Sequence, residues 1–251
     1  MEFEGKVAIV TGGGQGIGRG CTEALAEKGA TVVITQRTAA KGEKCAEELR
    51  AAGYNVEYVQ VDMRDDNQVN ALFDHVMKKY GRLDFLVNNA GISSPAPDIF
   101  DVTQEMWDDV IATNLDAPML CAQRAQKEMV KSGGGKIINI ASLAGINGGD
   151  SSPINYAASK GALIGLTRCL SNDFRSEGVS VNNLALGVVK TAIWDGAPDE
   201  IIDAVSSKIR AGRMGTPEEC GKICAFMCSE GADFLEGITV LAHGGVRNVV
   251  Y

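Results

Sequence analysis

Short apolar, β-branched runs recur along the chain with helical patterns between them, and this alternation limits the possible folds most strongly. The predicted strands are 6–11, 30–35, 56–61, 83–87, 136–140, 179–185 and 238–242. The predicted helices are 16–28, 40–52, 67–80, 104–131, 155–176 and 217–228. Strand–helix alternation over the whole length predicts an α/β fold, with a doubly wound, mainly seven-stranded parallel sheet covered by helices on both faces.

The composition is that of a globular protein, and no linker, repeat or low-complexity segment divides it. We therefore expect one domain, residues 1–251. The 24 Lys+Arg and 32 Asp+Glu residues give a net charge of −8 without a basic cluster, which argues against binding of nucleic acid or an anionic membrane. No apolar run approaches the length of a membrane span, and the N-terminus lacks the basic start of a signal peptide. These features predict a cytoplasmic protein.

The seven cysteines do not form a recognisable disulfide framework or metal site. Cys220, Cys224 and Cys228 share one helix face, but the outer pair would lie about 12 Å apart along a helix. One zinc ion cannot collect all three thiolates. We expect a buried stripe of small apolar residues there. His75 and His243 are also far apart, so no metal site is predicted.

A glycine-rich segment directly follows the first predicted strand and opens the first helix. Gly12, Gly16 and Gly18 have the spacing G-x-x-x-G-x-G. Glycines permit a tight turn and let backbone N–H groups and the helix N-terminus approach a pyrophosphate. The strand–loop–helix context therefore predicts a dinucleotide-binding loop.

Tyr156 and Lys160 are four residues apart in a predicted helix, so their side chains share a face. An ammonium beside a phenol stabilises the phenolate and lowers the pKa of the tyrosine from about 10. Such a tyrosine can act as a general acid or base. By itself this spacing is weak evidence, because most such pairs are ordinary surface pairs.

The segment 191–213 breaks the strand–helix rhythm and is predicted to be a substrate lid, with a surface helical excursion as the alternative. Trp194 lies at its start. An indole can stack on a flat or aliphatic substrate and exclude water. We expect Trp194 to lie over the substrate, or otherwise to pack the lid against the body of the protein.

Four motifs occur in a fixed order: Thr-Gly-x-x-x-Gly-x-Gly at 11–18, Asn-Asn-Ala-Gly at 88–91, Ser142, and Tyr156-x-x-x-Lys160. In order and spacing the chain resembles the short-chain dehydrogenase/reductase family, in its compact branch of roughly 250 residues, over essentially all its length. The resemblance implies a Rossmann-like fold and hydride transfer between a nicotinamide coenzyme and a small-molecule ketone or secondary alcohol. It also implies a homotetramer, or a homodimer.

The resemblance assigns four catalytic roles. Tyr156 would donate or remove the proton, Lys160 would lower its pKa and hold the nicotinamide ribose, and Ser142 would bond the substrate oxygen. Asn114 would support a water-mediated proton relay to the lysine. The alternatives are a helix-to-helix hydrogen bond for Asn114 and a turn hydroxyl for Ser142.

The resemblance also implies a set of coenzyme-binding residues. They are Gly12, Gln15, Gly16, Ile17, Gly18, Arg37, Thr38, Asp62, Met63, Asn89, Ala90, Gly91, Tyr156, Lys160, Gly187, Val189 and Thr191. Asp62 would meet the adenine amino group, unless it only caps the following helix. Val189 would offer its backbone to the nicotinamide carboxamide. Leu186 and His243 depart from the family's usual Pro and Asp, which leaves the looseness of one loop and the contacts of the C-terminal tail open.

The preferred coenzyme is predicted from the end of the second strand. A carboxylate there would bond both ribose hydroxyls and select NAD, but Thr35-Gln36-Arg37-Thr38 contains none. Arg37 offers a fork of donors suited to phosphate, unless it is a solvated loop charge. NADP(H) is therefore preferred. NAD(H) stays possible, because relatives that prefer NADP often carry a basic residue near the position of Gln15.

The sequence thus predicts an NADP(H)-dependent oxidoreductase acting on a secondary alcohol or ketone, with the protein positioning the coenzyme and supplying the proton. Its substrate class stays open among 3-oxoacyl, sugar or polyol, steroid and general carbonyl compounds. The alternative is a non-catalytic nucleotide-sensing or scaffold protein on the same fold.

Overall fold

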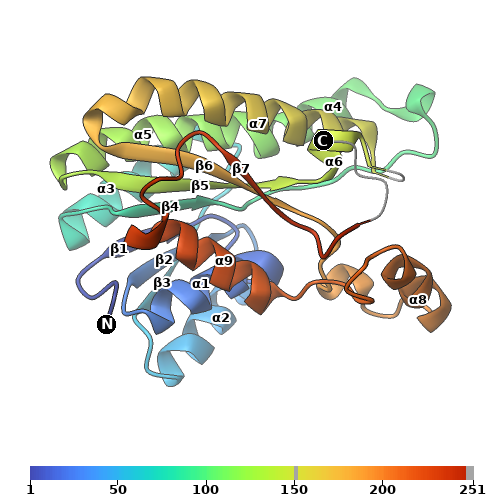
Figure 1. The fold of residues 1–251 in the computed structure, drawn as a ribbon. Coiled ribbons are helices and arrows are strands. Elements are labelled where there is room, and N and C mark those ends of the chain that lie inside the picture. The colour runs from blue at the N-terminus through green and yellow to red at the C-terminus, as the bar shows by residue number, and fades with distance from the viewer. Residues whose placement is uncertain (150–151, 247–251) are drawn as a thin grey trace.

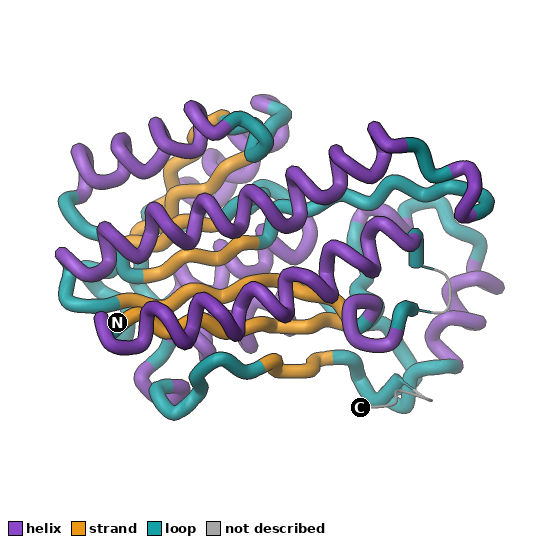
Figure 2. The backbone as a smooth tube through the Cα atoms, turned by 90° about the horizontal axis from the view of Figure 1, so that it is seen from above, coloured by secondary structure: helices purple, strands orange, loops and turns teal. Residues whose placement is uncertain are grey.

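The computed structural model describes residues 1–149 and 152–246. Its centre is one parallel sheet in the order β3-β2-β1-β4-β5-β6-β7, with helices on both faces (Figure 1; Figure 2). The strands are β1 (Val7–Val10), β2 (Thr31–Gln36), β3 (Val56–Gln60), β4 (Phe85–Asn88), β5 (Gly135–Ser142), β6 (Val179–Leu186) and β7 (Thr239–Ala242). The doubly wound α/β fold is confirmed, and each strand lies within two residues of its predicted bounds.

Alternate side chains of the strands enter two separate core layers. In β1, Ala8 and Val10 face one layer while Val7 and Ile9 face the other. The first layer is covered by α1 (Gly16–Glu27), α2 (Ala39–Ala51) and α9 (Pro217–Cys228). The second is covered by α3 (Asp66–Tyr80), α5 (Ala117–Lys131) and α7 (Ile154–Phe174). Since both faces of β1 are buried, its four residues are all apolar.

Helices α1 and α9 touch through their backbones at a pair of glycines. A Cβ atom on either Gly20 or Gly221 would lie 2.0 Å from a carbonyl oxygen of the other helix. Cys220, Cys224 and Cys228 are buried along α9 beside this contact. The predicted buried stripe of small residues is therefore confirmed.

The prediction of one continuous helix over 104–131 is wrong, because the helix is interrupted. The chain forms α4 (Gln104–Ile111), a π-helical segment (Ala112–Asp116) and then α5. The N–H of Ala117 bonds the Ala112 carbonyl, five residues back. Pro118 explains the wider turn: it has no N–H for the carbonyl four residues earlier, and its ring would clash with that carbonyl in a regular helix.

A row of buried amides crosses the sheet near the carboxyl ends of its strands. Asn88, Asn139 and Asn183 are register neighbours on β4, β5 and β6. The Asn88 amide donates to Asn139 at 2.8 Å, and the Asn139 amide donates to the Thr167 hydroxyl of α7 at 2.8 Å. These bonds fix β4 and β5 to α7, the helix that carries the Tyr-x-x-x-Lys motif.

Candidate active site

A cavity of about 570 Å³ lies at the carboxyl ends of the strands, where the order reverses between β1 and β4. Such a switch point is the usual ligand site of open α/β sheets. Most of the predicted site residues line it: Gly12, Gln15, Gly16, Ile17, Gly18, Arg37, Thr38, Asp62, Met63, Asn89, Ala90, Gly91, Ser142, Tyr156, Lys160, Gly187 and Thr191. Asn114 and Val189 do not. The structure thus brings both ends of the predicted site into one cavity.

The glycine-rich loop presents an open helix N-terminus to this cavity. Gly12 and Gly16 have φ angles of 64° and 52°, in the left-handed region that favours glycine. At Gly18 a Cβ atom would lie 2.3 Å from the Gly12 carbonyl oxygen. Gln15 starts α1 without a side-chain cap, and the first turn holds no acidic residue. Backbone N–H groups and the helix dipole therefore favour an anionic group there.

The loops that follow β1 and β4 are bound directly to each other. The Thr11 hydroxyl accepts hydrogen bonds from the backbone N–H groups of Asn89 and Ala90, both at 3.0 Å. The Asn89 amide in turn donates to the Thr11 carbonyl at 2.9 Å. These bonds hold the Asn-Asn-Ala-Gly segment against the glycine-rich loop, so the two motifs form one wall of the cavity.

Ser142, Tyr156 and Lys160 meet at the other end of the cavity. Ser142 is the last residue of β5, and its hydroxyl accepts the N–H of Ala144 at 3.1 Å while sharing a hydrogen bond with the Tyr156 phenol. Lys160 lies one turn further along α7, with Nζ 5.8 Å from the centre of the Tyr156 ring. Its ammonium donates to the Ile140 carbonyl at 2.8 Å. Ser142 therefore contacts the phenol as well as serving its turn.

The pKa shifts of the two titratable groups differ from the expectation. Burial raises the pKa of the Tyr156 phenol above its ordinary value, and the hydrogen bond from Ser142 offsets this only in part. Burial lowers the pKa of Lys160 to about 8. The predicted lowering of the Tyr156 pKa is therefore wrong. Loss of water around the phenol disfavours the charged phenolate and is the larger of the two effects.

Asn114 lies in the π-helical segment, fully buried. Its side-chain oxygen accepts the Ile92 N–H at 2.8 Å, and its amide donates to the Ile92 carbonyl at 2.9 Å. The same amide also donates to the Ser159 hydroxyl of α7 at 3.0 Å. The structure thus shows the helix-to-helix bond given as the alternative, while the role in a proton relay stays a prediction.

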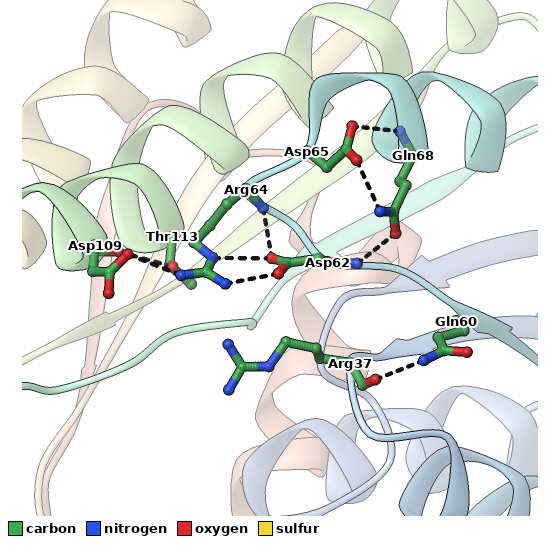
Figure 3. A network of polar contacts seen from close by, with 8 residues as sticks. All are labelled: Arg37, Gln60, Asp62, Arg64, Asp65, Gln68, Asp109 and Thr113. Atoms are coloured by element: carbon green, nitrogen blue, oxygen red, sulfur yellow. Dashed lines mark hydrogen bonds and ion pairs between the residues drawn. The ribbon is translucent and has the colours of Figure 1, made fainter.

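The opposite end of the cavity holds a network of charged residues after β3 (Figure 3). Asp62 does not cap α3, because Asp65 does so by accepting the N–H groups of Asn67 and Gln68. Asp62 instead forms a salt bridge with Arg64. The sequence prediction missed two cations that line this end, namely Arg64 and Lys41. Their positions just past the ends of β3 and β2 were the available signal.

The structure also describes the predicted lid segment 191–213 and the two residues that depart from the family pattern, Leu186 and His243. Residues 192–194 form a short 3₁₀ turn and α8 (Asp199–Ser207) extends beyond the sheet, as Figure 1 shows. Ile193, which is 82% exposed, lines the cavity, whereas Trp194 does not. That the indole lies over the substrate stays a prediction. Leu186 is buried at the end of β6. A Cβ atom on Gly187 would lie 2.7 Å from that of His243, so these two segments pack tightly.

The described part of the chain holds neither a membrane-spanning helix nor a cluster of metal-ligating side chains. Over residues 1–149 and 152–246 no helix combines the length and apolar character needed to cross a membrane. Over the same residues no group of three or more His, Cys, Asp or Glu side chains is arranged to hold a metal ion.

Comparisons with known proteins show which proteins this chain resembles. Residues 12–247 match a family described as enoyl-(acyl carrier protein) reductase. The chain is 35% identical to the 3-oxoacyl-[acyl-carrier-protein] reductase FabG of Pseudomonas aeruginosa, covering 98% of this chain and 99% of that protein. It is 34% identical to the cis-4-hydroxycyclohexanecarboxylate dehydrogenase of Sinomonas cyclohexanicum, covering 98% of each.

A solved structure shows the same arrangement in space. The crystal structure of gox2181 superposes with a TM-score of 0.92 at 30% identity, covering 96% of this chain and 95% of that one. The family match and the relatives span nearly the whole chain, and the sequence motifs line one cavity in the expected order. The chain belongs to the short-chain dehydrogenase/reductase family of oxidoreductases.

Proposed function

We propose that the protein is an NADP(H)-dependent oxidoreductase that interconverts a ketone and a secondary alcohol. One observation carries the proposal: Ser142, Tyr156 and Lys160 line the same cavity as the glycine-rich loop. A proton donor thus lies at one end of a cavity whose other end suits a dinucleotide. A reduced nicotinamide, when bound, supplies the hydride that such chemistry requires.

The charges at the adenosine end fit a phosphorylated ribose. Arg37, Lys41 and Arg64 line this end, against the single carboxylate of Asp62. Thr38 begins α2 without a side-chain cap, which leaves a second helix N-terminus open beside Arg37. A 2′-phosphate would therefore meet the side chains of Arg37 and Lys41 and backbone N–H groups of α2, which supports NADP(H) over NAD(H).

The residues at the other end divide the work on the substrate. Ser142 would orient the ketone oxygen, and Tyr156 would donate its phenolic proton to that oxygen. The ammonium of Lys160 would then stabilise the phenolate that remains. Asn114 would act indirectly, since its bonds to Ile92 and Ser159 hold the surrounding backbone.

We infer a small-molecule ketone rather than a protein-bound acyl group as the substrate. The segment 92–123, which follows β4 beside the cavity, contains no Lys or Arg. Its side chains Asp98, Asp101 and Glu105 are exposed. A surface that receives a carrier protein is expected to be basic, so this acidic segment favours a free substrate.

The test is NADPH oxidation with a panel of acyl, sugar, steroid, alicyclic and aryl ketones. We expect turnover of at least one ketone by the wild type, and a loss of about 100-fold or more in kcat with Tyr156→Phe. Phe keeps the ring, so the Kd for NADPH should change by less than about two-fold. Binding of NADPH without oxidation by any ketone would instead support the non-catalytic alternative.

A further inference from the structure

Arg64 lies at the adenosine end of the cavity, between two carboxylates that come from different elements (Figure 3). Its guanidinium forms a bidentate salt bridge with Asp62, with Nε 3.1 Å from Oδ1 and Nη2 2.8 Å from Oδ2. The Arg64 backbone N–H adds a third bond to Oδ1 at 3.1 Å. From the other side, Nη1 donates to Asp109 of α4 at 2.8 Å. Both oxygens of Asp62 are therefore occupied.

Arg37 is the other arginine at this end, and its side chain is not held in the same way. Its backbone carbonyl accepts the Gln60 amide at 3.0 Å. Among the described residues, its guanidinium makes no hydrogen bond or ion pair. In Figure 3 the side chain extends from the end of β2 toward the side on which Arg64 grips Asp62. The hydrogen bonds to Arg64 chiefly lower the pKa of Asp62, and the charge of Arg37 contributes to the same shift.

The charge of Arg37 thus acts on the Asp62 carboxylate, but the hydrogen bonds and the salt bridge of that carboxylate go to Arg64. Without Arg64, Asp62 would be drawn toward Arg37, whose charge already acts on it. That pairing would remove Arg37 as a ligand for a phosphate, whereas an Asp62 left unpaired would place a bare negative charge near the phosphate. The fork to Arg64, fixed in turn by Asp109, prevents both effects.

We propose that Arg64 is a positioning residue for coenzyme selectivity: it sequesters Asp62 and so leaves Arg37 available to a 2′-phosphate. The proposal rests on the proposed function of this cavity as an NADP(H) site. Arg64 acts through Asp62 and Arg37 rather than by contact with the phosphate. Its effect should therefore be confined to the phosphorylated coenzyme and should depend on the Asp62 charge.

The test is calorimetric titration of the purified protein with NADPH and with NADH. We expect Arg64→Leu to weaken NADPH binding by roughly ten-fold, the size expected for one uncompensated charge in a partly exposed site, and NADH binding by less than about two-fold. The double variant Asp62→Asn/Arg64→Leu should recover most of the NADPH affinity. The loss should also shrink at high salt concentration, since the cause is a charge.

Arg82→Leu provides a matched control. Arg82 forms a similar bidentate salt bridge with Asp84, two residues later, with Nε 2.8 Å from Oδ2 and Nη2 2.6 Å from Oδ1. This pair lies at the amino end of β4, away from the cavity. Its loss should leave the NADPH-to-NADH affinity ratio unchanged. The inference would be overturned if Arg64→Leu weakened the binding of NADPH and NADH equally, or if the double variant recovered no NADPH affinity. The coenzyme site itself would still be supported in that case, provided that the wild type binds NADPH. A wild type that binds neither dinucleotide would refute the proposed function itself.

Discussion

The buried ammonium of Lys160 makes protein stability depend on pH in a direction that can be stated in advance. The residue is 4% exposed, and burial lowers its pKa from 10.5 to about 8. Between these values the unfolded chain holds a proton that the folded protein has released. Since stability rises with pH wherever the unfolded state binds more protons, the folded state gains stability through this window. Below pH 8 the folded protein bears the full penalty of the buried charge.

The size of the effect follows from the pKa difference, which corresponds to about 3 kcal/mol. In Lys160→Met the penalty is absent, because methionine fills similar space without a charge. The free energy of unfolding of the wild type relative to this variant should therefore rise by about 3 kcal/mol between pH 7 and pH 10.5. The bond from Lys160 to the Ile140 carbonyl is absent from the variant at every pH, so the test rests on the change with pH and not on the absolute difference.

Urea unfolding of both proteins across this pH range measures the difference directly. Other groups titrate above pH 9, but they are common to both chains and cancel. Lys78→Met, on the exposed surface of α3, is the control for removing any lysine. A wild-type-minus-variant difference that stays flat or falls with pH would refute the reasoning.

Three further predictions concern packing, the amide row and catalysis. Gly20→Ala should cost about 2 kcal/mol or more of unfolding free energy in urea, because its Cβ would lie 2.0 Å from a carbonyl oxygen. Gly165→Ala in α7, where a Cβ meets nothing within 4 Å, should stabilise the protein by about 0.5–1 kcal/mol; equal effects of the two would contradict this. Asn139→Leu should destabilise the protein by about 2–4 kcal/mol, because its buried partners Asn88 and Thr167 each lose a hydrogen bond. An unchanged Tm would contradict a stabilising role of the amide row. The pH profile of kcat/KM for NADPH should fall above about pH 8 as the Lys160 ammonium deprotonates, and a profile flat to pH 10 would exclude it from catalysis.

The fold could be predicted because its central strands, such as β1 and β4, are buried on both faces. Such strands must be continuous apolar runs, as Val7–Val10 is, and these runs are visible in the sequence. The interruption between α4 and α5 was also visible, since Pro118 cannot continue a regular helix. The buried amide row was not, because an asparagine is acceptable in a core strand only when its register neighbours supply partners.

The motifs of the site could be predicted for a topological reason. Parallel strands place the loops at their carboxyl ends on one edge of the sheet, so motifs that follow different strands converge. The partner of Arg64 could not be predicted in this way. Asp109 lies 45 positions further along the chain, on a helix that only the tertiary structure places beside the end of β3. The position of Ile193 rather than Trp194 in the cavity lining likewise depends on the path of a short 3₁₀ turn.

The upward shift of the Tyr156 pKa bears on whether reduction or oxidation is favoured at a given pH. A phenol whose pKa is raised by burial stays protonated at neutral pH, and a protonated phenol can donate but cannot accept a proton. Donation leaves a phenolate, which the Lys160 ammonium, about one helical turn away, would stabilise only after it has formed. Because the pKa of Lys160 is about 8, most of the ammonium is present at neutral pH. For the proposed reaction we therefore expect ketone reduction to proceed at neutral pH, and alcohol oxidation to require a higher pH, at which the phenol begins to ionise.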